Sequence, residues 1–306
     1  MRAPSDGHLL LASAHAGSAD REAVEAARAV LAAAGRVQVM STGTPEQLDA
    51  ALDCCGERRL VVAGGDGSLH LAVTRLRARG ELPERPIGLV PLGTGNDLAR
   101  AIGLPLDPEQ AARLVLEGEP GPMDLLVDDA GGVVVNAVHL GVGADAAQAA
   151  GRLKPRLGLL AYPLGALAAG VRASGWRLRV EVDGVVLADG HRRSLMVGIG
   201  NGPGIGGGTR LLPDALPHDG LLDVLVSYAT GPFARVRYGA ALAAGTHLTD
   251  RDVRSARGRS VTVRGEAVGV NADGELGEEV TARTWTVDPG AWSLVRPATA
   301  PTGSGG

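Results

Sequence analysis

Two glycine-rich segments in the first third of the chain constrain its fold more than any other feature. Residues 64–68 read GGDGS and residues 91–100 read PLGTGNDLAR. Each segment follows a short apolar run and leads into residues that favour a helix. In a parallel α/β sheet, such strand–turn–helix junctions lie at the carboxyl ends of the strands, where backbone N–H groups and helix N-termini bind anions. The two segments therefore predict an α/β sheet with a phosphate-binding edge.

The residue types in both segments suit phosphoryl-transfer chemistry. Glycine lets the main chain approach a ligand that a Cβ atom would keep away. The candidate phosphate- and nucleotide-binding residues are Gly64, Gly65, Gly67, Ser68, Gly93, Thr94, Gly95 and Asn96. Asp66 would place a carboxylate beside the phosphates, where Mg²⁺ or a substrate hydroxyl needs it. These residues predict a nucleotide-dependent phosphotransferase.

Three polar residues of these segments also have simpler interpretations. Asp66 can be a loop residue that caps the helix after it. Asn96 can be a plain N-cap of the helix that begins at Asp97. Asp97 can hold Mg²⁺ through water, or it can merely favour the positive end of the helix dipole. The residues by themselves leave these alternatives open.

A third acidic motif lies much later in the chain, where residues 271–275 read NADGE. Asp273 and Glu275 flank a glycine, so two carboxylates would share one tight turn after a strand. An ordinary β-turn accounts for the same residues. Spacing alone favours the turn.

The pattern along the chain predicts two domains. Residues 8–124 alternate short apolar runs with helical segments, which is typical of an α/β domain. After residue 122 the pattern changes to strand-like runs, one of them over residues 133–138, with hairpin signatures at residues 129–132 and 183–184. Helices are expected over residues 158–173 and 233–244. We expect an α/β nucleotide-binding domain over 1–122, a β-rich substrate domain over 123–296 and a disordered tail over 297–306.

Charge and composition exclude several classes of protein. A formal net charge of −4 and an isoelectric point near 6.0 give no basic surface for nucleic acid. Cys54 and Cys55 are adjacent and cannot form a disulfide framework, which favours a reducing compartment. The longest apolar stretch, residues 158–171, is shorter than the ~20 residues that span a bilayer, and no signal peptide is evident. We expect a cytoplasmic protein.

The two glycine segments, in this order and at this spacing, resemble the diacylglycerol kinase catalytic family, the lipid kinases that include sphingosine and ceramide kinases. The first segment more distantly resembles NAD kinase. The resemblance extends to near residue 290. It implies a Rossmann-like α/β nucleotide domain, a C-terminal β-sandwich-type domain and an active site in the cleft between them. It also implies ATP and Mg²⁺ as cofactors.

The resemblance assigns roles to the acidic residues. It implies that Asp273 is the general base and that Glu275 supports it. Asp66 faces the phosphates and the metal, and it is the alternative base. Asp97 and Asp124 belong to the metal–water network around Mg²⁺.

One further segment resembles a structural metal site of the family. Asp219 lies on an Asp-Gly turn and would be the side-chain ligand of a structural Mg²⁺. A turn without metal is an equally good interpretation. The chain also departs from the family at residues 13–17, which read SAHAG where relatives carry Asn-Pro and use the Asn to contact the nucleotide.

The expected activity is transfer of the γ-phosphoryl group of ATP to a lipid hydroxyl, with diacylglycerol as the preferred acceptor and phosphatidic acid as the product. Other acceptors remain open: a sphingoid base, phosphatidylglycerol or NAD. A non-catalytic lipid-binding pseudokinase is the remaining alternative. Because the acceptor lies in a bilayer, we expect transient peripheral contact with the inner face of the membrane. An edge strand of the β domain could also pair two copies into a homodimer.

Overall fold

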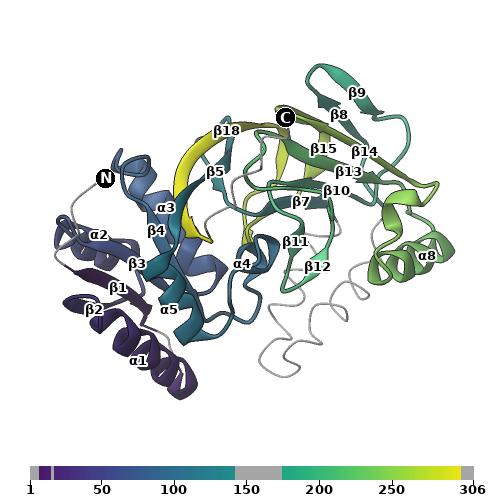
Figure 1. Cartoon of the computed structure of the whole chain (residues 1–306). Helices are drawn as coiled ribbons and strands as arrows, with labels where there is room; N and C mark the ends of the chain where they lie inside the picture. The colour runs from purple at the N-terminus through teal and green to yellow at the C-terminus, as the bar shows by residue number, and fades with distance from the viewer. Residues whose placement is uncertain (1–6, 15–16, 142–173, 298–306) are drawn as a thin grey trace, which may run out of the picture. The chain divides into compact units, whose positions relative to one another are not determined.

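The structure is a computed structural model that describes residues 7–14, 17–141 and 174–297 (Figure 1). The chain forms two compact units, Met1–Met123 with Gly290–Gly306, and Asp124–Pro289. The helix expected over residues 158–173 lies outside the described residues, as does the expected tail from residue 298 on. Within the described ranges, no helix is both long and apolar enough to cross a membrane.

The first unit is built on a parallel sheet in the strand order β2-β1-β3-β4-β18. Its strands are β1 (His8–Ser13), β2 (Val37–Thr42), β3 (Arg59–Gly64), β4 (Ile87–Pro91) and the end of β18 (Val280–Arg296). Its helices are α1 (Ser18–Ala32), α2 (Pro45–Asp53), α3 (Asp66–Ala78), α4 (Asp97–Ala101) and α5 (Pro108–Glu117). This arrangement confirms the expected α/β domain.

Helices cover both faces of this sheet, which explains its continuously apolar strands. On one face, Leu31 of α1 and Val115 of α5 pack against Leu10 and Val61 of the strands. On the other face, α2 and α3 lie together, joined by a hydrogen bond of 3.0 Å from Arg75 Nε to Asp49 Oδ1. Adjacent strand residues point to opposite faces, so both kinds of position must be apolar.

The second unit contains two antiparallel sheet regions. One has the order β14-β13-β10-β7-β16-β17 and the other joins the start of β18 to β15, β8 and β9. The strands are β5 (Glu119–Asp128), β6 (Val133–Val134), β7 (Ala137–Gly141), β8 (Leu178–Val182), β9 (Val185–Asp189), β10 (Met196–Gly200), β13 (Leu222–Ser227), β14 (Val253–Gly258), β15 (Ser260–Val268), β16 (Val270–Ala272) and β17 (Glu275–Leu276). Buried side chains from both regions, including Leu140, Val261 and Trp285, form one core. The expected β-sandwich-type domain is confirmed.

Both expected hairpins are present in the second unit. β5 pairs with β6 in antiparallel fashion, and β8 pairs with β9. At the second turn, Asp183 and Gly184 have φ of 49° and 80°, the left-handed geometry of a tight hairpin. A separate small core supports the short strands β11 (Gly204–Ile205) and β12 (Thr209–Arg210), the helix α8 (Pro232–Ala243) and the 3₁₀ turn η2 (His247–Thr249).

Two predictions about the strands need correction. The prediction of one continuous strand over residues 133–138 is wrong, because β6 ends at Val134 and β7 begins at Ala137. The last part of β18 groups with the first unit, where Leu294 pairs with Ile87 of β4, although the sequence pattern places it in the second domain. Local patterns do not specify which distant strand will be a partner, so this return of the chain has no local signal.

Candidate functional site

The two glycine loops of the first unit lie against each other. β3 and β4 are parallel neighbours, and Leu92 N donates a hydrogen bond of 3.0 Å to Gly64 O just beyond them. A Cβ atom on Gly65 would lie 2.8 Å from Gly93 Cα, and one on Gly93 would lie 2.5 Å from Gly65 Cα. Neither residue can therefore carry a side chain without moving the other loop. The expected meeting of both loops at one sheet edge is present.

The glycines of the first loop serve two different purposes. A Cβ atom on Gly64 would lie 2.5 Å from Ser68 Oγ, so this glycine makes room for the helix that follows. Gly65 makes room for the second loop. Gly67 is different, because it is exposed and a Cβ atom there would meet nothing within 4 Å. Of these three glycines, only Gly67 opens onto free space where a ligand can approach.

Asp66 joins the two loops through its carboxylate. Its Oδ2 accepts a hydrogen bond of 3.1 Å from Asp97 N, and its Oδ1 accepts one of 3.3 Å from Leu98 N. These N–H groups open α4, where a helix has unsatisfied donors and a positive end. Asp66 thus caps the helix of the other loop rather than α3, its own helix. Neither interpretation from the sequence includes this contact.

Asn96 closes the second loop from inside. It is buried and has φ of 51°, a left-handed conformation that Asn tolerates better than most residues. Gly93 N donates 2.9 Å to its Oδ1, and its Nδ2 donates 2.7 Å to Gly93 O. Asn96 occupies the N-cap position of α4, as one interpretation predicts, but its amide group bonds to Gly93 instead of to the helix.

The groups at the outer rim of this edge suit a phosphate and its cation. Thr94 is exposed, and α3 begins with no side-chain cap on its first N–H groups. Asp66 and the buried Asp97 bring two carboxylates to the same helix start. No cluster of three metal-ligating side chains exists in the described ranges. Mg²⁺ often binds one or two carboxylates and takes its other ligands from phosphate and water, so this donor set fits it.

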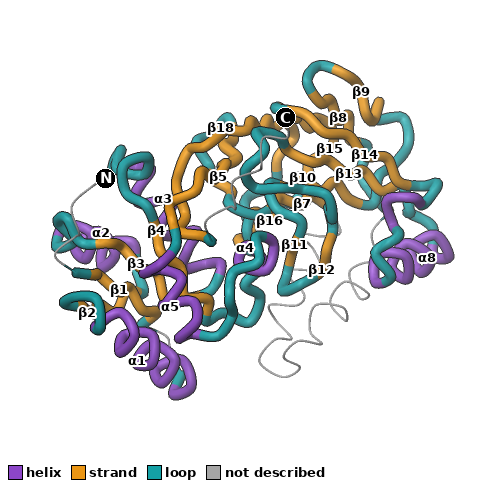
Figure 2. Tube along the Cα trace, in the orientation of Figure 1, coloured by secondary structure: helices purple, strands orange, loops and turns teal. Residues whose placement is uncertain are grey.

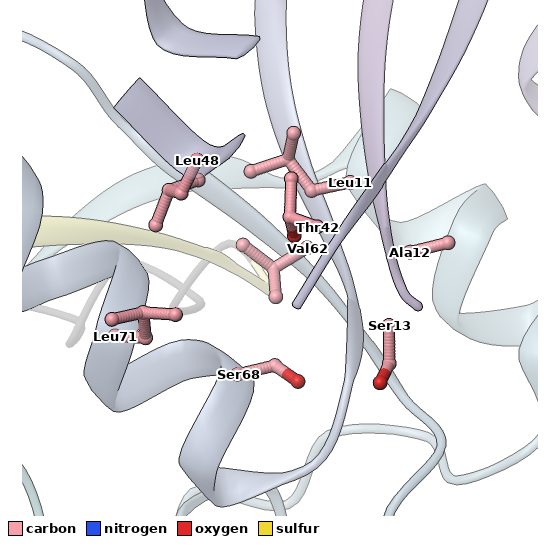
Figure 3. A pocket seen from close by; sticks show the side chains of 8 residues that line it. All are labelled: Leu11, Ala12, Ser13, Thr42, Leu48, Val62, Ser68 and Leu71. Carbon is pink, nitrogen blue, oxygen red and sulfur yellow. The ribbon is translucent and has the colours of Figure 1, made fainter. Parts of the chain in front are cut away.

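A small cavity lies beside this edge, at the ends of β1 and β2 (Figure 3). Its volume of about 30 Å³ is enough for a water molecule. The hydroxyl groups of Ser13 and Ser68 face the same opening in Figure 3, and Thr42 also lines it. Ser13 belongs to the segment that was expected to differ from the family. A larger amide at Ser13 would reduce this space.

Asp273 in the second unit is held by three backbone donors. Val135 N donates 2.6 Å to its Oδ2, while Asn136 N and Ala137 N donate 2.8 Å and 3.0 Å to its Oδ1. Val135 and Asn136 lie in the gap between β6 and β7 and Ala137 begins β7, so these hydrogen bonds hold the chain where the expected strand is interrupted. Asp273 has φ of 50° and Gly274 has φ of 91°, so the β-turn interpretation of this motif is also correct.

Glu275 does not hydrogen-bond to the Asp273 turn through its side chain. It is exposed at the start of β17, where it pairs with Ala272 of β16, and its carboxylate forms no hydrogen bond or ion pair with the residues that the structure describes. The neighbour that does brace the turn is Asn271, which is fully buried and accepts a hydrogen bond of 3.0 Å from Gly274 N. The structure therefore brings Asn271, and not Glu275, to the support of the Asp273 turn.

Asp124 and Asp219 hold one loop between them. Asp124 is buried, and its Oδ2 accepts a hydrogen bond of 2.7 Å from Gly220 N. Asp219 accepts a hydrogen bond of 3.0 Å from Leu221 N and forms an ion pair with Arg257. A guanidinium thus occupies one side of the carboxylate that was expected to bind a structural metal.

Asn201 is a buried polar residue for which the sequence predicts no role. It is 1% exposed, and its Nδ2 donates 3.1 Å to Asp124 O and 2.7 Å to Val135 O. It thereby ties the start of the Asp124 loop to the segment that Asp273 holds. An Asn between two glycines after an apolar run is the only local signal that could have indicated it.

A parallel α/β sheet with paired glycine loops, followed in the chain by an antiparallel β sandwich, is the architecture of a class of two-domain kinases. Residues 8–127 match the model of the diacylglycerol kinase catalytic domain. Residues 136–296 match the model of the YegS C-terminal NAD kinase beta sandwich-like domain. The chain belongs to the family of YegS-like lipid kinases and diacylglycerol kinases.

Relatives with curated names support this assignment. A Pseudomonas aeruginosa protein named "Probable lipid kinase YegS-like" is 33% identical, over 97% of this chain and 97% of its own length. A diacylglycerol kinase of Mycobacterium tuberculosis is 30% identical, over 79% of this chain and 78% of its own length. The match to a relative from Stenotrophomonas maltophilia, at 37% identity, spans only 55% of that protein.

Solved structures show the same fold. A diacylglycerol kinase from Bacillus anthracis superposes with a TM-score of 0.70 at 18% sequence identity, covering 98% of this chain and 100% of that one.

Proposed function

We propose that the protein transfers the γ-phosphoryl group of ATP to a hydroxyl of a membrane lipid, with diacylglycerol as the acceptor that we favour. The observation that carries the proposal is the contact of Gly65 with Gly93, together with the link from Asp66 to the start of α4. This contact joins the two phosphate-binding motifs into one edge. Membership of a lipid kinase family supports the acceptor class.

ATP with Mg²⁺, when bound, would supply the phosphoryl group and the neutralising charge. The first turn of α3 and the exposed Gly67 and Thr94 would orient the phosphates with backbone and hydroxyl donors. Asp66 and Asp97 would hold the cation, directly or through water. Each carboxylate is fixed before a ligand arrives, one by its bonds to α4 and the other by burial in that helix.

Asp273 remains our candidate for the group that accepts the proton of the acceptor hydroxyl, and Asp66 is the alternative. Three N–H donors fix the orientation of the Asp273 carboxylate. A carboxylate has about four lone-pair sites, so some capacity to accept a further hydrogen bond is left. Glu275 is exposed and would support Asp273 only once the acceptor is bound.

A non-catalytic lipid-binding protein is the second candidate, and one observation favours it. Both Asp66 and Asp273 already accept backbone hydrogen bonds, so each has a structural reason to be present without catalysis.

The test is transfer of labelled γ-phosphate from ATP and Mg²⁺ to micelles of diacylglycerol, sphingosine, ceramide and phosphatidylglycerol, with NAD as a soluble acceptor. We expect labelled phosphatidic acid, and a loss on the order of 10²-fold or more in Asp273→Asn. Circular dichroism and thermal unfolding of the variant separate lost chemistry from lost structure. Labelled phosphate in NAD would show that NAD, and not a lipid, is the acceptor. Binding to lipid vesicles without any consumption of ATP would establish the non-catalytic lipid-binding protein.

A folded Asp273→Asn variant with near-normal turnover would transfer the role of base to Asp66. The matched variant Asp66→Asn then tests Asp66 as the base, since it removes the negative charge of that carboxylate. Glu275→Gln is the folding control, because the side chain of Glu275 is exposed and the substitution keeps its backbone pairing with Ala272.

A further inference from the structure

The outward face of α8 is apolar and exposed. Phe233, the chain's only phenylalanine, is 90% exposed, and Val236 one turn later is 69% exposed. The other exposed positions of this helix, Pro232, Gly239, Ala240 and Ala243, carry no charge. Exposed contiguous apolar groups of this kind mark sites of contact with a partner or a membrane.

The inner face of α8 fixes this orientation. Tyr238 is 5% exposed and donates a hydrogen bond of 3.6 Å to Met196 Sδ. On the same side, Arg237 binds Asp250 through Nε at 2.8 Å. These contacts prevent the helix from rotating to bury Phe233. The exposed ring is therefore a stable property of the second unit, in which α8 is the one α-helix among the described residues (Figure 2).

The charged groups next to this helix are mainly arginines. Arg235 and Arg237 lie on its flanks, Arg251 is exposed on the following loop, and Arg192 joins them through Asp252. Asp250 and Asp252 form ion pairs with Arg237, and Asp252 also with Arg192. Arg192, Arg237 and Arg251 together carry one positive charge more than these two aspartates, and this surplus complements anionic headgroups.

We propose that α8 is the element by which the protein binds an anionic lipid surface, with Phe233 and Val236 inserted at the level of the headgroups. The proposal rests on the proposed function, because a lipid acceptor must be reached at a bilayer. A patch of two large side chains is much smaller than the ~800 Å² per partner of a stable protein interface. It suits shallow insertion beside arginines that bind lipid phosphates.

The experiment measures binding of the full chain to vesicles of phosphatidylcholine alone and of phosphatidylcholine with phosphatidylglycerol, by flotation. Phe233→Ser and Val236→Ser are compared with Val185→Ser on the β8–β9 hairpin. Val185 is the matched control because it is 71% exposed, close to the 69% of Val236. We expect the wild type to prefer the anionic vesicles, Phe233→Ser to bind roughly tenfold more weakly, and Val185→Ser to bind like the wild type.

A second variant reports insertion directly. Of the three native tryptophans, Trp285 and Trp292 are 1% exposed and Trp176 is partly buried against the core, so Phe233→Trp adds the one indole on the outward face of α8. We expect its emission to move to shorter wavelength when anionic vesicles are added. Vesicle binding does not require turnover, so these results hold whether or not labelled phosphate reaches any acceptor.

Three outcomes would overturn the proposal. Equal vesicle binding by the wild type and Phe233→Ser would exclude this face as the contact. An equal loss in Val185→Ser would show that general surface hydrophobicity is measured instead. A wild type that is dimeric by light scattering and a monomeric Phe233→Ser, with no vesicle binding by either, would make this face an interface between copies of the chain.

Discussion

The glycine loops of the first unit and the Asp273 turn of the second both use an aspartate to collect backbone N–H groups. Asp66 accepts two, at 3.1 and 3.3 Å, from the start of a helix that already has unsatisfied donors. Asp273 accepts three, at 2.6 to 3.0 Å, from the two residues between β6 and β7 and from the first residue of β7. The first carboxylate completes a regular element, whereas the second maintains an irregular one. Removal of the Asp273 carboxylate should therefore lower the free energy of unfolding more than removal of the Asp66 carboxylate.

Asp273→Ala gives the largest expected effect. It leaves the N–H groups of residues 135–137 without their acceptor, at about 1 kcal/mol or more each, so the free energy of unfolding should fall by about 3 kcal/mol. Asp66→Ala should cost about 1 kcal/mol, as for a lost helix cap. Urea denaturation of both variants measures the difference. Equal losses would mean that the two carboxylates are structurally equivalent, contrary to the comparison.

Gly65→Ala and Gly67→Ala test the loop contact within the first unit. The new Cβ of Gly65→Ala would meet backbone at 2.8 Å, whereas that of Gly67→Ala meets nothing within 4 Å. We expect Gly65→Ala to lose about 2 kcal/mol and Gly67→Ala to remain as stable as the wild type. Thermal unfolding measures both. If Gly67 faces phosphate, Gly67→Ala should still weaken ATP binding, and unchanged ATP affinity would place the nucleotide elsewhere.

His139 makes the second unit sensitive to acid. Burial lowers the pKa of His139 from 6.5 to about 4, so the unfolded chain binds a proton at pH values where the folded chain does not. Stability should be full above pH 6.5 and decrease as the pH falls toward 4, by about 2 kcal/mol at pH 5. Urea unfolding at pH 7 and pH 5 measures this loss.

His139→Leu is the control for this prediction, since it removes the titrating group from a buried site of β7. The variant should lose less stability than the wild type between pH 7 and pH 5. A wild type with no such loss would show that the ring of His139 is protonated in the folded protein, against the effect of burial.

Asp219→Asn gives the smallest expected effect. The side chains of Asp219 and Arg257 are 23% and 43% exposed, so their ion pair is screened by water. We expect a change of less than about 1 kcal/mol in unfolding free energy. A larger loss that appears only with Mg²⁺ present would restore Asp219 as a metal ligand.

The sequence predicts the first unit better than the second, for a physical reason. Its elements are set by local features: buried apolar strands, glycines at the strand ends and caps such as Thr44, which accepts a hydrogen bond from Gln47 N. The contact of Gly65 with Gly93 follows from strand order. The bond from Asp66 to α4 does not, because it depends on how closely two loops pack.

In the second unit, the hairpins follow from their turn residues, but the functional contacts are long-range. Asp273 reaches residues 136 to 138 positions earlier in the chain, and no local pattern encodes that pairing. The same holds for Asn201, whose two acceptors lie 66 and 77 positions away. The family resemblance predicts that Glu275 supports Asp273, whereas the side chain that hydrogen-bonds within the Asp273 turn is that of Asn271.

The strand β18 has a consequence for how the protein is made. β4 ends at Pro91, but the strand that covers its outer edge contains Leu294, which is among the last residues described. At ribosomal rates of about 5–20 residues per second, roughly ten to forty seconds separate the synthesis of these two partners. During that interval the nascent first unit has an open sheet edge. Its final closure must therefore wait until β18 has been synthesised.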